Sequence, residues 1–465
     1  MTSRYSVHLL LSVILLTGSI GARAQVLTLK DAVQTALNNY GSIKAKANYV
    51  NASKASAEQA RRDYLPNFSV SAQQDYGTIN GQNGPLYGFG GLGVASSGMA
   101  MPEQNWNAAF GALYLANINW EFFAFGRMKE KIKTAETLAR RDERDWQQEQ
   151  FRHEVKVAAT YLNLLAAQRL TKAWERNLER ADTFRSVVTR RALNGLIAGV
   201  DSSLANAEVA NAKISLVRSR DVEQEQGNQL AQLMGTAPQP YILDSFILTR
   251  LPAVVTDTVA MRIDVHPVLQ FYQSRIRLSQ EQEKYIRTLQ YPAFSLFSIL
   301  QTRGSGFKAE YITDHTAFTR DYWTGVKPTR TNYLFGVGVT WNLTSIARVS
   351  KQVSAQEYTS KALQNEMEVI DQQLKAQLSL ADTKMKNAID TYREALVQIK
   401  SASDAYLQKT VMYKNGLSTL VDVTQALYTL NRAETDRDVA YSNVWQALLL
   451  KAAAAGDFGL FINEF

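Results

Sequence analysis

Two aspartates in equivalent surroundings are the residues of this sequence best suited to chemistry. Asp201 closes the stretch 194–201 (Asn-Gly-Leu-Ile-Ala-Gly-Val-Asp), and Asp422 lies in the stretch 415–423 (Asn-Gly-Leu-Ser-Thr-Leu-Val-Asp-Val). The two carboxylates stand 422 − 201 = 221 positions apart. Carboxylates that meet around a common axis would concentrate negative potential and attract cations. A carboxylate in the first turn of a helix would instead cap that helix, so both roles are open.

Other signatures of covalent or cofactor chemistry are absent or weak. The chain has no cysteine, which excludes disulfides, Cys-ligated metals and a cysteine nucleophile. Residues 88–93 fit G-x-G-x-x-G, but they lie in a glycine-rich stretch without the strand and helix that a dinucleotide site requires. We therefore expect no enzymatic activity, no metal and no cofactor. None of the histidines has a spacing suited to metal ligation: His8, His153, His266 and His315.

The N-terminal residues 1–24 read as a cleaved secretory signal. Arg4 precedes an apolar run at 9–16, and Ala22 and Ala24 supply the small residues that a signal peptidase reads. A single membrane anchor is the alternative, but the run is shorter than the ~20 residues that a spanning helix needs. The full chain carries a formal charge of +8 with acids and bases interleaved, which gives no basic patch for nucleic acid. No later stretch is apolar enough for a transmembrane helix, so a membrane role would need strands.

Further landmarks keep the offset of 221 residues, including Trp120 with Trp341 and Gly235 with Gly456. A constant offset over so long a stretch indicates a duplicated unit. We expect a first repeat at 25–238, an inter-repeat linker at 239–262 and a second repeat at 263–465. Each repeat is expected to hold two strands and two helical rods, with strands at 67–76, 107–121, 294–301 and 332–343 and rods at 126–191, 200–234, 346–413 and 420–455.

The expected rods and strands differ in the period of their apolar residues. In the third rod, small and apolar residues from Leu374 to Tyr406 step by four and three, which is typical of helices that wind around partners. The strand at 332–343 alternates aromatic or branched residues with small or polar ones, as a strand of a membrane β-barrel does. An ordinary sandwich strand and a soluble coiled-coil homodimer are the alternatives. Residues 77–105, which are rich in glycine, and residues 302–330 are expected as exposed loops.

The number of strands has a consequence for assembly. Four strands per chain cannot close a barrel, and an open edge in lipid would leave backbone amides unpaired at several kcal/mol each. Twelve strands from three chains would close and leave a lumen. A homotrimer is the simplest solution.

The order of these elements resembles one known family. A signal, a helix, Tyr64-Leu65-Pro66 before a strand pair, a long rod, an Asn-Gly-Leu tip and a return rod, all but the signal duplicated, are similar to the outer-membrane efflux proteins of the TolC family. The resemblance implies a mainly α fold with a β-barrel part, in which a trimeric 12-strand barrel in the outer membrane continues as an α-helical tunnel across the periplasm. It also implies three kinds of partner: a periplasmic adaptor, an inner-membrane pump that is proton-driven or of the ABC type, and outer-membrane lipid. The implied function is a passive conduit that exports drugs or other small molecules and opens and closes at the helix tips.

The resemblance also assigns roles at the two tips. Asp201 and Asp422 match acidic positions at the pore constriction. Ser418 stands where the best-known member has a latch arginine, and Gln425 occupies a second acidic-ring position. A conduit for an ABC-type protein secretion system and a periplasmic coiled-coil scaffold that transports nothing are alternative functions. The tip turns that would dock the adaptor comprise Asn194, Gly195, Leu196, Asn415, Gly416, Leu417, Thr419 and Val421.

Overall fold

The computed structural model describes residues 26–81, 88–89, 92–93, 99–244, 251–252 and 265–464. The expected signal at 1–24 therefore lies outside the described residues, as do most of the linker at 239–262 and part of the glycine-rich loop. The chain forms two compact units, each of which combines segments of both expected repeats. Unit 1 comprises Met1–Val50, Arg140–Arg275 and Leu363–Phe465, and unit 2 comprises Asn51–Ala139 and Ile276–Ala362.

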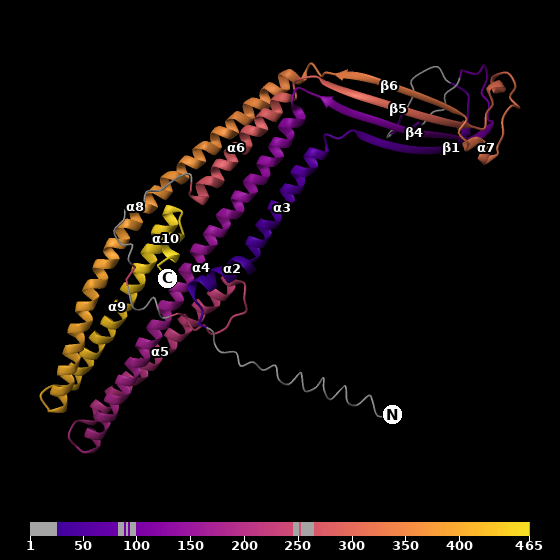
Figure 1. Cartoon of the computed structure of the whole chain (residues 1–465). Coiled ribbons are helices and arrows are strands. Elements are labelled where there is room, and N and C mark those ends of the chain that lie inside the picture. The colour runs from indigo at the N-terminus through magenta and orange to yellow at the C-terminus, as the bar shows by residue number, and fades with distance from the viewer. Residues whose placement is uncertain are drawn as a thin grey trace, which may run out of the picture. The chain divides into compact units, whose positions relative to one another are not determined.

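Two very long helices dominate the secondary structure (Figure 1). Helix α4 has 67 residues and helix α8 has 70, so each is about 100 Å long at ~1.5 Å per residue. Neither contains a proline that would remove a backbone hydrogen bond. None of the helices in the described part of the chain is long and apolar enough to cross a membrane. The helices are α2 Leu29–Asn39, α3 Gly41–Arg62, α4 Arg127–Leu193, α5 Gly199–Met234, α6 Pro267–Thr288, α7 Tyr322–Val326, α8 Ser345–Lys414, α9 Leu420–Ala455 and α10 Gly459–Ile462.

Unit 2 contains a four-stranded antiparallel sheet of order β1-β4-β5-β6 (Figure 1). The register shows which residues share a face: Phe68 pairs with Ile118, Ile118 with Ser298, and Ser298 with Phe335. This face is aromatic and aliphatic, and on the edge strand β6 it is open, since Tyr333 is 85% exposed. The strands are β1 Asn67–Thr78, β4 Ala108–Phe123, β5 Ala293–Ser305 and β6 Arg330–Thr340, and a separate short pair joins β2 Gly88–Phe89 to β3 Leu92–Gly93.

The segment between β5 and β6 is more structured than the loop expected at 302–330. Strand β5 continues to Ser305, and the chain then forms a 3-10 turn at Ala309–Ile312 and the short helix α7. Tyr311 is buried against Phe307 and Phe318, whose rings lie 4.7 and 5.9 Å from its own. An aromatic cluster therefore holds this segment together.

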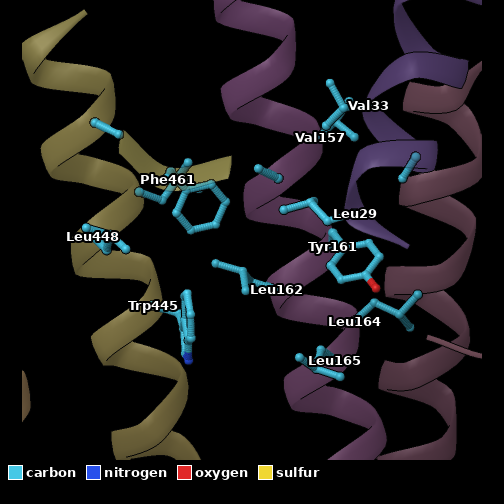
Figure 2. Packing of buried hydrophobic residues seen from close by; sticks show 14 of the residues in the cluster. Leu29, Val33, Val157, Tyr161, Leu162, Leu164, Leu165, Trp445, Leu448 and Phe461 are labelled. Atoms are coloured by element: carbon cyan, nitrogen blue, oxygen red, sulfur yellow. The ribbon is translucent and has the colours of Figure 1, made fainter. Parts of the chain in front are cut away.

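Unit 1 has a hydrophobic core where α2, α4, α9 and α10 meet (Figure 2). Trp445 and Phe461 pack edge to face at 6.4 Å, opposite Leu162 of α4. The Tyr161 hydroxyl donates a 2.8 Å hydrogen bond to the carbonyl oxygen of Leu27, and burial raises the pKa of that hydroxyl. Each such side chain contributes roughly 1.5–3 kcal/mol through burial. The core fixes the helices from which the two tips extend.

Equivalent contacts recur in the two halves of the chain. The Trp120 indole N–H donates to the Tyr64 carbonyl oxygen at 2.8 Å, and the Trp341 indole N–H donates to the Gln290 carbonyl oxygen at 3.0 Å. Each tryptophan thereby ties the end of a strand to the segment that follows a helix. These bonds give Trp120 and Trp341 a structural role.

Candidate functional site

The turns after α4 and α8 have the same geometry. The Leu196 N–H donates to the Arg191 carbonyl oxygen at 3.0 Å, and the Leu417 N–H donates to the Met412 carbonyl oxygen at 2.9 Å. This five-residue return bond is the mark of a Schellman helix end, which requires a left-handed residue just before its donor. Gly195 and Gly416 supply it, with φ of 69° and 77°. Apart from the adjacent residues, no atom lies within 4 Å of where a Cβ would stand on either residue, so the backbone angle, not crowding, requires glycine.

Both turns expose apolar side chains at the ends of the rods. Leu196 is 65% exposed and Leu417 is 72% exposed. Val200 and Val421, in the first turns of the return helices, are exposed as well. A Schellman end usually buries the hydrophobic residue after its glycine against the helix. Here those leucines are open, so each tip offers an apolar surface.

The second tip carries a complete capping box. The Asp422 N–H donates to the Thr419 hydroxyl at 3.2 Å, and the Asp422 carboxylate oxygen Oδ2 accepts from the Thr419 backbone N–H at 3.0 Å. The Ser418 and Thr419 hydroxyls donate to the same oxygen at 2.9 and 3.0 Å. These bonds, the backbone one first, lower the pKa of Asp422 to about 2. The carboxylate is therefore ionised at any physiological pH, and Ser418 supports it.

The other carboxylate oxygen of Asp422 is less engaged. Its Oδ1 lies 3.8 Å from the Lys409 ammonium, and the side chain remains partly exposed. Asp422 thus caps α9 with one oxygen and offers the other to solvent. Gln425, one turn further along α9, is exposed, and its backbone oxygen accepts from the Thr429 hydroxyl at 2.9 Å.

The first tip lacks this box although Asp201 occupies the matching place. The residue that precedes α5 is Ala198, which has no side-chain oxygen to accept from the helix. The Asp201 N–H bonds to the Ala198 carbonyl oxygen at 3.1 Å instead. Within the described residues, Asp201 and Asp422 share no hydrogen bond or ion pair. The equivalent aspartates therefore have different local roles.

Arg191 joins the two tips, and sequence reasoning missed it. Its Nη1 donates a 2.8 Å hydrogen bond to the Tyr413 carbonyl oxygen, and its guanidinium lies 5.1 Å from the centre of the Tyr413 ring. Phe184 packs on the same ring at 5.4 Å. The only signal in the sequence is a basic residue in the last turn of a helix, which is too common to single out. We name the pair of Arg191 and Tyr413 the tip clasp.

A small hydrophobic cluster lies behind the tip clasp. It contains Val188 of α4, Ala205 of α5, Tyr413 of α8, and Leu420 and Val423 of α9, all of them buried. A second link lies further up the rods, where the Tyr428 hydroxyl donates to Glu208 at 2.7 Å. Across the described part of the chain, no group of three His, Asp or Glu side chains is placed to hold a metal. The arrangement is that of a joint between two helix pairs.

Comparisons with known proteins agree with this architecture. The model of the outer membrane efflux protein family matches residues 32–236, which is most of the first expected repeat. No curated protein sequence matches the chain.

Solved structures of several outer-membrane channels share the fold over nearly the whole chain. The outer-membrane channel OprN has a TM-score of 0.72 at 17% identity and covers 93% of this chain and 90% of its own. VceC of Vibrio cholerae has a TM-score of 0.71 at 16% identity, covering 92% of this chain and 96% of its own. The Campylobacter jejuni channel CmeC has a TM-score of 0.72 at 15% identity, covering 92% of this chain and 85% of its own.

The expected fold class is confirmed by these likenesses: long helix pairs with four antiparallel strands, as in the outer-membrane channels. Channels of this family form trimers and run from the outer membrane into the periplasm, and they act without enzymatic chemistry. The chain is thus similar to the outer membrane efflux proteins, the TolC family, in sequence over residues 32–236 and in fold over nearly its whole length.

Proposed function

We propose that three copies of this chain form the outer-membrane conduit of a tripartite efflux system, which exports drugs or other small molecules passively and is gated at the helix tips. A periplasmic adaptor and an inner-membrane pump, proton-driven or of the ABC type, would complete the system. The observation that carries the gate is the tip clasp, because it joins the two helix pairs at their ends by a contact that can break without unfolding either helix.

The sheet supports closure by three chains. Strands β1 and β6 are its outer strands, and neither has a further partner among the described residues. Unpaired backbone groups in lipid cost several kcal/mol each, so such edges need partners from neighbouring copies. Three copies of the four strands give 3 × 4 = 12, enough to close around a lumen. The apolar face of β6 would then meet lipid.

The tips support gating by charge as well as by contact. Asp422 caps α9 through Oδ2 and leaves Oδ1 facing Lys409 and solvent, so capping and pore lining are compatible. Three Asp422 carboxylates near one axis, with Asp201 and Gln425 beside them, would favour cations at the constriction. The exposed Leu196 and Leu417 give a periplasmic adaptor an apolar surface at the same place.

The test is block of the reconstituted channel by a multivalent cation, hexaamminecobalt, in planar bilayers. We expect block of the wild-type channel and loss of block in Asp422→Asn. Thr419→Ala is the matched control, because it breaks the same capping box but keeps the carboxylate, and it should keep the block. Equal block in wild type and Asp422→Asn would overturn the role of Asp422. A chain that forms no conducting pores would favour the scaffold that transports nothing.

A further inference from the structure

The segment between β5 and β6 packs on the apolar face of the sheet, which is the face of Ile118 and Ser298 described above. Gly304 and Phe110 belong to the same face, because each is an even number of residues from Ser298 along β5 or from Ile118 along β4. A Cβ on Gly304 would lie 2.7 Å from the Gly325 carbonyl oxygen, and a Cβ on Gly325 would lie 2.6 Å from the Phe110 Cβ. Helix α7, which contains Gly325, therefore lies directly against this face.

Side chains of two strands hold α7 in this position. The Tyr322 hydroxyl of α7 donates a 2.7 Å hydrogen bond to Oε1 of Gln74 on β1. The Tyr114 hydroxyl of β4 donates to the Val326 carbonyl oxygen at 3.2 Å, and the Val326 side chain is buried. The Tyr322 ring also packs edge to face on the Phe110 ring at 5.2 Å. Helix α7 is thus a folded part of the apolar side of the sheet.

Helix α7 leaves a large indole open, since Trp323 is 75% exposed. Exposed charged residues flank the helix: Lys327 follows it, and Asp321 precedes it and accepts from the Thr324 N–H at 2.7 Å. Charged side chains are costly in the hydrocarbon core of a bilayer, whereas the apolar surface of an indole is costly in water. Both are accommodated at the boundary between acyl chains and headgroups, where tryptophan is enriched.

The position of α7 matches the end of the apolar row on β6. The alternate residues of this row, from Tyr333 to Val339, are exposed and uncharged, and they span about 20 Å at ~3.3 Å per residue. This length is close to the ~25 Å height of the lipid-facing band of outer-membrane barrels. Beyond Tyr333 the face becomes polar, where the hydroxyls of Thr302 and Thr331 lie 3.0 Å apart, and β5 then reaches Gly304 beneath α7. Helix α7 therefore lies where the apolar row ends.

We infer that α7 is a membrane anchor, in which Trp323 lies among outer-leaflet lipids at the level where acyl chains meet headgroups. The inference rests on the proposed function, because closure by three chains turns the apolar face toward lipid. Helices α6 and α8 adjoin the start of β5 and the end of β6, whereas α7 lies between the other two ends of these strands. A helical tunnel across the periplasm therefore places α7 on the outer side of the membrane. The occupant is lipid, because Trp323 continues the row that meets lipid.

The test measures the depth of position 323 in vesicles that contain the full trimeric channel. The chain has no cysteine, so Trp323→Cys carries a single thiol for a bimane label. We expect lipids with bromine near the headgroup to quench this label roughly twofold, and more strongly than lipids with bromine near the chain end. Phe335→Cys, in the middle of the apolar row, should show the reverse order. The matched control is Leu334→Cys, an exposed neighbour on the opposite face, which neither lipid should quench.

A second measurement needs no label. Bromine near the headgroup should quench a larger fraction of the tryptophan fluorescence in the wild-type channel than in Trp323→Phe. Equal fractions in the two proteins would overturn the inference even if Trp323→Cys fails to assemble.

The outcomes separate the anchor from the channel. Equal quenching at positions 334 and 335 would mean that the two faces of the sheet do not divide lumen from lipid, which sinks the proposed function. Quenching at 335 without quenching at 323 sinks only the anchor. In that case red-shifted bimane emission at 323 would show that the position faces water, and blue-shifted emission would show that a neighbouring copy covers it.

Discussion

The tip clasp gives the sharpest prediction for gating. Replacing Arg191 by methionine removes the hydrogen bond to the Tyr413 carbonyl oxygen and the contact with the Tyr413 ring. Methionine is the residue that the chain itself uses at the equivalent place in the second tip, Met412, since 191 + 221 = 412. It also keeps the length and helix propensity of the side chain. The change therefore leaves both helices intact and weakens the joint between them.

The magnitude follows from the geometry. A hydrogen bond to a charged group contributes about 1.5–3 kcal/mol, and a cation–π contact at a partly exposed site about 0.5–1 kcal/mol. Arg191 is half-buried, so water replaces part of both interactions when the clasp opens. The Tyr413 carbonyl oxygen still accepts from the Gly416 N–H at 3.1 Å, so no buried acceptor is left unpaired. We take about 2 kcal/mol per protomer, which corresponds to a roughly 30-fold shift of the opening equilibrium.

The assay is the open probability of single channels in planar bilayers. Arg191→Met should raise it strongly over wild type, while the trimer stays folded and resistant to heat. Arg190→Met is the matched control, because it removes the same charge from the adjacent, exposed position. An open probability that is the same in wild type, Arg190→Met and Arg191→Met would refute the reasoning, since the clasp would then not hold the tips closed.

Three further predictions concern single residues. Tyr413→Phe should leave the open probability and stability unchanged or slightly raise stability, because the buried Tyr413 hydroxyl has no hydrogen-bond partner in the described structure; denaturant unfolding checks this. Ala198→Thr should install at the first tip the cap that Thr419 provides at the second, and should raise stability by about 0.5–1 kcal/mol in the same assay. Burial lowers the pKa of His266, so the folded form keeps it neutral while the unfolded chain takes up a proton near pH 6.5. Stability should therefore fall as the pH drops below about 6.5. His266→Asn, whose side-chain oxygen can accept from the Val268 N–H as the imidazole nitrogen does at 3.2 Å, should reduce that pH dependence in thermal unfolding.

The tip turns could be predicted from the sequence because their causes are local. The sequence Asn-Gly-Leu at the end of a long proline-free helical pattern predicts a helix end. Such an end requires only a residue in the left-handed conformation and a backbone hydrogen bond back to the helix, and both turns have these. The helix limits follow for the same reason: α9 begins at Leu420 and α8 ends at Lys414. The tip clasp could not be predicted, since Arg191 and Tyr413 are 222 positions apart and meet only when two helix pairs pack with a definite rotation.

The boundaries of β5 and α7 could not be predicted either. Strand β5 was expected at 294–301 but extends to Ser305. The extension was not predicted because the last residues are polar and lack the apolar alternation that marks a strand. Pairing with β4 keeps them extended: Arg303 stands opposite Leu113 and Ser305 opposite Gly111. Helix α7 was missed because five residues hold too little periodic signal. Partners distant in the sequence, not local preference, set these boundaries.

The two tips have equivalent positions in the duplicated sequence, but different contacts stabilise them. The second tip is fixed to itself by the capping box of Thr419 and Asp422, whereas the first has Ala198 and no side-chain cap. Instead, Arg191 of the first tip donates a hydrogen bond to Tyr413 of the second. Opening at the tips requires the loss of the Arg191 hydrogen bond, its ring contact and the burial in a five-residue cluster. Further along the helices, the Tyr428–Glu208 hydrogen bond and the Arg180–Glu434 ion pair also join the two helix pairs. Opening requires no refolding of a helix end, so the motion that we propose is a rigid-body separation of two helix pairs, which Arg191 opposes and which leaves the Asp422 cap intact.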